Sequence, residues 1–411
     1  MYEYLCPRCF GGIEGSATVS QESAGTVRDS LWRHGTGAAV SRRSWPLDAL
    51  RVFAALVVVC QHWGPYGLGD LAGPGAPSML MRYGFMGVDV FFFISGVVIT
   101  RSAVGRHPRD FVVARFARLA PAYLLILGAT IVVGILVSDP RLSFESALSS
   151  LTFSEYVTGT ESGGLLILDS WTLWVEIQFY LLIALFLLAG LLLPRKSQRR
   201  PFPSLSQLRV VYLVWLALLA MALANVQEIP GLLTLAGYAS IFLCGALFGT
   251  VVSWRDALRM SPILLLATTM MLFRFLERAS GAAIEPTDFG GALAPTLVGV
   301  GLVLLCVAAA LGSLSARPLP MRLAKVLTLC ALATYPLYLM HQELGNRLVI
   351  WLQGTGGLAA PLALIIAFAV VVALSLFISS RLEPVARRWI VATWRPTPAQ
   401  PEQESPVSPK G

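Results

Sequence analysis

Long apolar runs, separated by short polar connections, dominate the pattern of hydrophobic and polar positions from residue 47 to residue 381. Because a helix needs ~20 apolar residues to cross a bilayer core, each run predicts a membrane-spanning helix. The fourth and ninth runs exceed one crossing, and Pro336 in the ninth is a site for a kink. The ten predicted spans are 47–63, 84–101, 117–137, 166–193, 207–225, 231–252, 261–277, 291–312, 323–350 and 358–381.

The composition agrees with a membrane protein. The 411 residues are 56% hydrophobic and 13% charged, whereas soluble domains carry about 25% charged residues. We therefore predict an all-α, polytopic helical bundle over residues 45–390, after a polar N-terminal leader (1–44) and before a Pro/Glu/Ser-rich disordered tail (391–411). The net charge of +8 does not indicate nucleic-acid binding, because the basic residues lie in short connections between apolar runs.

The distribution of charge predicts an orientation. Basic residues gather in every second connection, and the intervening connections hold mainly acids. By the positive-inside rule, both termini face the cytoplasm and the odd-numbered spans run outward, in the cytoplasmic (inner) membrane. The basic connections lie at residues 42–43, 101–118, 195–200, 255–259, 317–322 and 387–388.

Metal and redox signals are weak. Cys6 and Cys9 form the leader sequence CPRC, and a single CxxC without a second pair is not specific for zinc or for redox chemistry. We predict no metal site and no bound cofactor.

The first span carries two ionisable residues. Arg51 and His62 are eleven positions apart, which is roughly three helical turns, so both lie on nearly one face about 16 Å apart. A charged group facing lipid costs at least ~2.5 kcal/mol, so such residues face a bundle interior and mark a functional path.

The other ionisable residues fall into two groups by predicted depth. An acid/base group near the outer side suits proton transfer, because histidine titrates near neutrality. An arginine group near the cytoplasm suits phosphate binding, because arginine binds phosphates bidentately. The acid/base group comprises His62, Asp89, Glu176 and His341, and the arginine group comprises Arg51, Arg115 and Arg118.

Structural roles are the alternative for several of these residues. Arg115 and Arg118, three apart on one helical face, also fit topology determinants. Asp89 also fits a helix N-terminal acid that the dipole favours, and the pair at 95–96 fits close packing against a neighbouring helix. Glu176, flanked by aromatic residues, needs a partner or a proton.

Five blocks of sequence resemble the acyltransferase 3 family of integral membrane O-acyltransferases. The first resembles the family's opening helix, in which ten residues separate an arginine from a histidine. Together the blocks span residues 45–390 in family order. They are LDALRVFAALVVVCQH with Arg51 and His62, GVDVFFFISG (87–96), RFARLAPAY (115–123), WTLWVEIQFY (171–180) and YPLYLMH (335–341).

The resemblance implies transfer of an acyl group, usually acetyl from acetyl-CoA, to a hydroxyl of a saccharide, lipid-linked glycan or macrolide-like acceptor. It implies that His62 is the base or acyl carrier and that Glu176 and Asp89 are essential supports, either of which could orient the imidazole. It assigns Arg51, Arg115 and Arg118 to the donor phosphates or to site geometry. Supporting roles are expected for Ser95, Tyr335 and His341.

Two features complete these expectations. Some family members carry a C-terminal hydrolase-like domain; we expect none after the last predicted span here, so a separate transfer partner on the outer side is a further expectation. The alternative function is a proton-coupled transporter or exporter, because carboxylates and histidines in membranes also form proton relays. The absence of an evident inverted repeat argues against the transporter. A catalytically inactive membrane partner of another enzyme is a third alternative.

Overall fold

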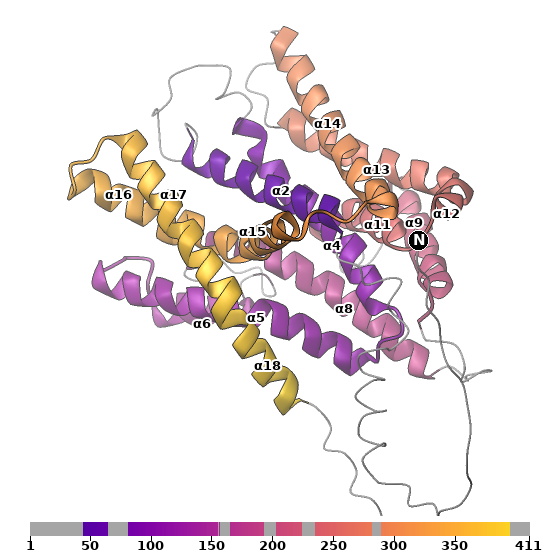
Figure 1. Cartoon of the computed structure of the whole chain (residues 1–411), viewed down its shortest axis with the longest axis horizontal. Coiled ribbons are helices and arrows are strands. Elements are labelled where there is room, and N and C mark those ends of the chain that lie inside the picture. The colour runs from indigo at the N-terminus through magenta and orange to yellow at the C-terminus, as the bar shows by residue number, and fades with distance from the viewer. Residues whose placement is uncertain are drawn as a thin grey trace, which may run out of the picture. The chain divides into compact units, whose positions relative to one another are not determined.

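The computed structural model of the chain describes residues 44–64, 81–154, 156, 165–192, 203–223, 235–281 and 289–394. The predicted leader up to residue 43, the CPRC pair and the tail beyond residue 394 lie outside the described residues. In the described part of the chain, helices account for all regular secondary structure (Figure 1). This confirms the predicted all-α class.

In the part of the chain that the structure describes, seven helical segments are long and apolar enough to cross a membrane: Trp45–Trp63, Arg82–Ala103, Pro108–Leu136, Leu168–Gly190, Leu293–Ser315, Met321–Gly354 and Ala360–Thr393. Each matches one predicted span. Helices also occupy the other three predicted positions, as α9 (Leu205–Leu223), α11 (Ala239–Gly249) and α13 (Ser261–Gly281). The chain is therefore a multi-pass membrane protein, whereas ten crossings and two cytoplasmic termini stay predictions.

The core is the crossing of α4 (Gly87–Ala103) and α11, the most extensive helix contact among the described residues (Figure 1). Nearly every residue of α11 is buried, and its 11 residues span only about 16 Å, so it is a core helix. A Cβ on Gly96 would lie 2.3 Å from the Phe242 carbonyl oxygen, and one on Gly245 would lie 2.1 Å from that of Phe93. Two glycines thus allow close backbone approach, so close packing, the alternative role considered for residues 95–96, is found at Gly96.

The helix α2 (Trp45–Trp63), which carries Arg51 and His62, packs against this core. Its start suits a helix, because Pro46 lies in the first turn and Asp48 complements the positive end of the dipole. α2 contacts α4, α14 (Phe289–Ser315) and α15 (Met321–Met340). The end of α2, with His62 in its last turn, therefore lies between the core and the C-terminal helices.

Three boundaries differ from the sequence predictions. α5 (Pro108–Leu136) begins nine residues before the predicted third span, because Pro108 suits the first turn of a helix; Arg115 and Arg118 therefore lie inside this helix. The ninth span is helical through Pro336 and departs from α geometry at the π-helix η4 (His341–Gly345). After α17 (Ala360–Phe377) and η5 (Ile378–Leu382), α18 (Glu383–Thr393) continues into the predicted tail.

The remaining described helices are shorter or connect these elements. They are η1 (Arg82–Met86), α6 (Phe144–Thr152), η2 (Leu168–Ser170), α8 (Trp171–Leu192), η3 (Leu235–Gly237), α12 (Trp254–Arg259) and α16 (Asn346–Gly354).

Candidate active site

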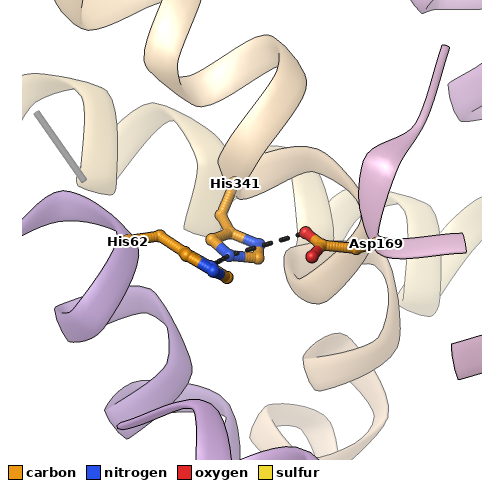
Figure 2. Close-up of side chains that lie close together, drawn as sticks. All are labelled: His62, Asp169 and His341. Atoms are coloured by element: carbon orange, nitrogen blue, oxygen red, sulfur yellow. Dashed lines mark hydrogen bonds and ion pairs between the residues drawn. The ribbon is translucent and has the colours of Figure 1, made fainter. Parts of the chain in front are cut away.

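Two histidines from opposite ends of the sequence meet at the end of α2. His62 Nδ1 lies 2.7 Å from His341 Nε2, a hydrogen-bond distance, and the two rings are stacked with their centroids 5.0 Å apart. Figure 2 shows the two side chains pointing toward each other from separate helical segments. The sequence predicted both residues for one acid/base group, and the structure brings them into contact.

Trp63, the residue after His62, fixes the contact between the two histidines. The indole N–H of Trp63 donates to the His341 carbonyl at 2.9 Å, and a Cβ on Gly345 would lie 2.4 Å from the Trp63 ring. Only glycine therefore fits where Trp63 packs on η4. π-helical turns frequently occur at functional sites, and here the π-turn begins at His341 itself.

The hydrogen bonds define which ring nitrogens of the two histidines carry a hydrogen. His341 Nδ1 lies 2.7 Å from the Tyr338 carbonyl oxygen, which can only accept, so this nitrogen carries a hydrogen. In the neutral ring, His341 Nε2 must then accept from the Nδ1–H of His62. This leaves the lone pair of His62 on Nε2, where a partly exposed imidazole can act as a base.

A carboxylate completes the cluster. Asp169 of η2 lies with Oδ2 3.8 Å from His341 Nε2, an ion-pair distance rather than a hydrogen bond (Figure 2). Asp169 and His341 are both buried. Asp169 was not among the residues predicted from the sequence, although an acid in the apolar run before Trp171 was a signal, because intramembrane carboxylates are costly.

The predicted acids lie elsewhere. Glu176 Oε1 accepts hydrogen bonds from the Ser95 hydroxyl at 2.8 Å and the Tyr180 hydroxyl at 2.5 Å. The structure therefore joins two predicted residues, Ser95 and Glu176, across α4 and α8. Neither is hydrogen-bonded to His62 in the described structure, so the group that orients His62 is His341 rather than Glu176.

Asp89 belongs to a different cluster. It is fully buried on α4, and Arg278 Nε donates to its Oδ2 at 2.9 Å. The same guanidinium donates to the Tyr238 hydroxyl at 2.8 Å and lies over the Phe85 ring. Arg278 was not singled out from the sequence. Its hydrogen bond to Asp89 links α4 to α13, so Asp89 is a partner of Arg278 rather than of His62.

The two arginines of α5 differ in environment. Arg118 donates to Glu383 of α18 at 2.6 Å and lies over the ring of Tyr335, whose hydroxyl donates to the Leu119 carbonyl. Arg115 stacks near the rings of Phe111 and Tyr180, and its buried Nε has no hydrogen-bond partner among the described residues. Arg115 can therefore donate a further hydrogen bond from Nε, whereas the guanidinium of Arg118 is paired with Glu383.

Arg51 lies on α2, eleven positions before His62. Its guanidinium lies 3.5 Å from Asp48 Oδ1 in the first turn of the same helix. The structure thus separates Arg51 from the histidine pair along the helix, as the spacing predicts.

An ion network between the connection after α5 and the segment of η4 and α16 braces η4. Arg141 donates to Glu343 Oε2 at 2.8 Å and to Asp139 Oδ2 at 3.2 Å, and Arg347 also bonds to Asp139. Burial alone would raise the pKa of Asp139, but hydrogen bonds from Arg347 and Arg141 hold that pKa well below its usual range. The network joins the segment after α5 to residues beside His341, and the sequence analysis did not foresee it.

Comparisons with known proteins agree with the resemblance. The family model described as an acyltransferase domain, of the acyltransferase 3 type, matches residues 46–380. A protein of Bacillus subtilis (strain 168) named "Putative peptidoglycan O-acetyltransferase YrhL" is 30% identical over 176 residues, which are 37% of this chain and 25% of that protein. No solved structure matches the chain.

A second relative is similar over a comparable length. The protein of Komagataeibacter xylinus named "Putative membrane-bound transacylase BcsY" is 33% identical over 168 residues, which are 38% of this chain and 39% of that protein. The matched region thus covers well under half of either relative. Because the family model covers most of the sequence, from the helix of His62 to the helices beyond His341, the chain belongs to the acyltransferase 3 family of membrane acyltransferases.

Proposed function

We propose that this acyltransferase moves an acyl group, acetyl in the simplest case, from acyl-CoA to a hydroxyl of a saccharide or glycolipid acceptor. The observation that carries the proposal is the hydrogen bond between His62 and His341, with Asp169 behind it. The names of the two relatives, a peptidoglycan O-acetyltransferase and a transacylase, support the same class of reaction.

The proposed reaction uses the free nitrogen of His62. Its Nε2 takes the proton of the acceptor hydroxyl as the oxygen attacks the thioester carbonyl. The carbon–sulfur bond then breaks, the new ester carries the acyl group, and the thiolate of CoA regains a proton from His62. A base positioned in this way contributes typically ~10²–10⁴-fold to a rate.

His341 and Asp169 stabilise the charge that this step creates. When His62 gains a proton on Nε2, its Nδ1 proton can shift along the 2.7 Å hydrogen bond to His341 Nε2. The positive charge then lies between the Tyr338 carbonyl and the Asp169 carboxylate. Asp169 therefore has a larger attraction for the transition state than for the neutral ground state, which is the condition for catalysis.

The donor is proposed to enter beside α5. Arg115 has an unused, buried Nε, and a guanidinium suits the phosphates of CoA. Glu176, tied to Ser95 and Tyr180, keeps α8 against α4 next to this arginine. The proposed role of Glu176 is therefore to keep α4 and α8 in place beside the path by which the donor enters.

The test is CoA release from acetyl-CoA by the purified full chain in lipid vesicles, with candidate saccharide and lipid acceptors. His62→Ala should abolish release, whereas His107→Ala, at the N-cap of α5, should not change it. Retained release in His62→Ala removes His62 from the mechanism. Substrate-dependent proton flux without CoA release would replace the proposal with proton-coupled transport.

A further inference from the structure

The histidine–aspartate cluster has the donor set of a transition-metal site. His62, His341 and Asp169 each offer one ligand atom, and the three atoms lie within 4.8 Å of one another. Tetrahedral Zn²⁺ with bonds of 2.0–2.2 Å holds its ligand atoms about 3.3 Å apart. Ligation therefore requires the histidine nitrogens, now 2.7 Å apart, to separate slightly and Asp169 to move closer, each by less than about 1.5 Å.

The surroundings of the three side chains favour this use. The hydrogen bond from His341 Nδ1 to the Tyr338 carbonyl directs the Nε2 lone pair inward, as outer-shell partners do for metal-bound histidine. Gln342 also faces the carboxylate, and with its amide nitrogen turned inward it lies 3.0 Å from both oxygens of Asp169. Two of the ligands are buried and the third, His62, is partly exposed, so the ion would reach the site from the side of His62 and water would supply the fourth ligand.

We infer that His62, His341 and Asp169 form a Zn²⁺ site and that Zn²⁺ bound there inhibits the enzyme. The ion binds Nδ1 of His62 in place of the hydrogen that His62 donates to His341, and that single ring hydrogen moves to Nε2. In the neutral, metal-bound imidazole the remaining hydrogen is on Nε2, so this nitrogen cannot accept the proton of a hydroxyl. The inhibition rests on the proposed function, whereas the binding of Zn²⁺ does not.

This site would correct the sequence prediction of no metal. The three ligands come from α2, η2 and η4, so no short spacing motif reveals them. The charge is also suitable, because the Asp169 carboxylate offsets part of the charge of the ion. The soft, nitrogen-containing donor set favours zinc over magnesium, which prefers oxygen ligands.

Binding is measured first, without any assay of activity. The full chain without an affinity tag, carrying Cys6→Ser and Cys9→Ser to remove the other candidate ligands, is stripped with a chelator. Zn²⁺ is then titrated in competition with a chromophoric zinc chelator. We expect one equivalent to bind and Mg²⁺ not to compete. Because loss of even an outer-shell partner weakens binding about 10- to 100-fold, Asp169→Asn and His341→Ala should each weaken it at least tenfold.

The control is His107→Ala, which should bind Zn²⁺ like the parent protein. If His341→Ala does not fold, the shape-conserving Asp169→Asn decides alone. Absence of bound Zn²⁺ at equimolar concentration, or equal affinity in Asp169→Asn and the parent, would overturn the site.

Activity then tests the inhibition. Zn²⁺ should reduce CoA release over the concentration range in which it binds, and a chelator should restore it. Full activity with the site saturated would overturn the inhibitory role. Zn²⁺ binding that depends on Asp169, in a protein that releases no CoA with any acceptor, would support the site while contradicting the proposed function.

Discussion

His62 Nδ1 and His341 Nε2 are 2.7 Å apart although the two residues lie 279 positions apart in the sequence. Neither helix alone makes the site. α2 supplies a histidine in its last turn and the π-turn η4 supplies the second, while Trp63 holds the two segments together by donating to the His341 carbonyl. The catalytic proposal therefore depends on the packing of the first span against the ninth.

The partner of His62 gives the most direct prediction. His341→Ala removes the acceptor for the Nδ1–H of His62. The base then loses both the group that orients it and the group that takes up its Nδ1 proton. We expect kcat to fall by about 10²-fold, at the lower end of the effect of a general base. Initial rates of CoA release in vesicles measure this change.

The matched variant is His341→Gln. The glutamine carbonyl can still accept a hydrogen bond from His62, but it cannot take up a proton at neutral pH. An activity between those of His341→Ala and the parent is therefore expected. Parent activity in both variants would show that His62 needs no partner.

Asp169 is predicted to act on the rate rather than on substrate binding. Asp169→Asn keeps the shape but removes the negative charge that faces the histidine pair at 3.8 Å. Because this charge matters only once the pair is protonated, kcat should fall by about tenfold with the KM for acetyl-CoA unchanged. Steady-state kinetics over donor concentration separate the two parameters. Glu277→Gln removes an exposed carboxylate paired with Arg274 and should be neutral; a rise in KM alone in Asp169→Asn would contradict the assignment.

Much of this fold could be predicted from the sequence. Each predicted apolar span coincides with a helix, because runs of about 20 apolar residues leave the chain few alternatives in a membrane. The cost of buried charge also singled out His62, His341 and Glu176, and each of them has a specific polar partner in the structure.

The partners themselves could not be predicted. Helix spacing gives the face of a residue but not the neighbouring helix, so Asp89 had no visible link to Arg278, which follows it by 189 positions. The π-turn at His341 arises from tertiary packing on Trp63, and local propensity carries no signal for it. For the same reason the orienting group of His62 was expected to be Glu176 or Asp89, whereas the structure supplies His341 and Asp169.

The ion network beside η4 predicts a pH dependence of stability. The pKa of Asp139 is lower in the folded protein than its unfolded value near 3.9. The network therefore stabilises the fold at every pH above that value, and this contribution is lost as the pH falls through the folded-state pKa. We expect the melting temperature difference between the parent and Asp139→Asn to be constant from pH 8 to 5 and to shrink below about pH 4.

The control for this network is again Glu277→Gln, whose ion pair is half exposed and should contribute little at any pH. At neutral pH, loss of the Asp139 hydrogen bonds should cost about 1–3 kcal/mol of unfolding free energy. Thermal unfolding in detergent at several pH values measures both variants. A difference that grows on acidification would mean that the carboxylate is not paired in the folded protein.

The last prediction separates the two arginines of α5. Arg118 is already neutralised by Glu383 at 2.6 Å, whereas Arg115 retains an unpartnered Nε. Arg115→Gln should therefore raise the KM for acetyl-CoA more than Arg118→Gln does, by about tenfold if one charged hydrogen bond of 1.5–3 kcal/mol is lost. Acetyl-pantetheine, which lacks the nucleotide phosphates, is the matched donor. With it, Arg115→Gln and the parent should have the same KM, because the bond that the variant removes is to a phosphate that this donor does not have. An equal loss with both donors would instead assign Arg115 to the structure of the site, through its stacking on Phe111 and Tyr180.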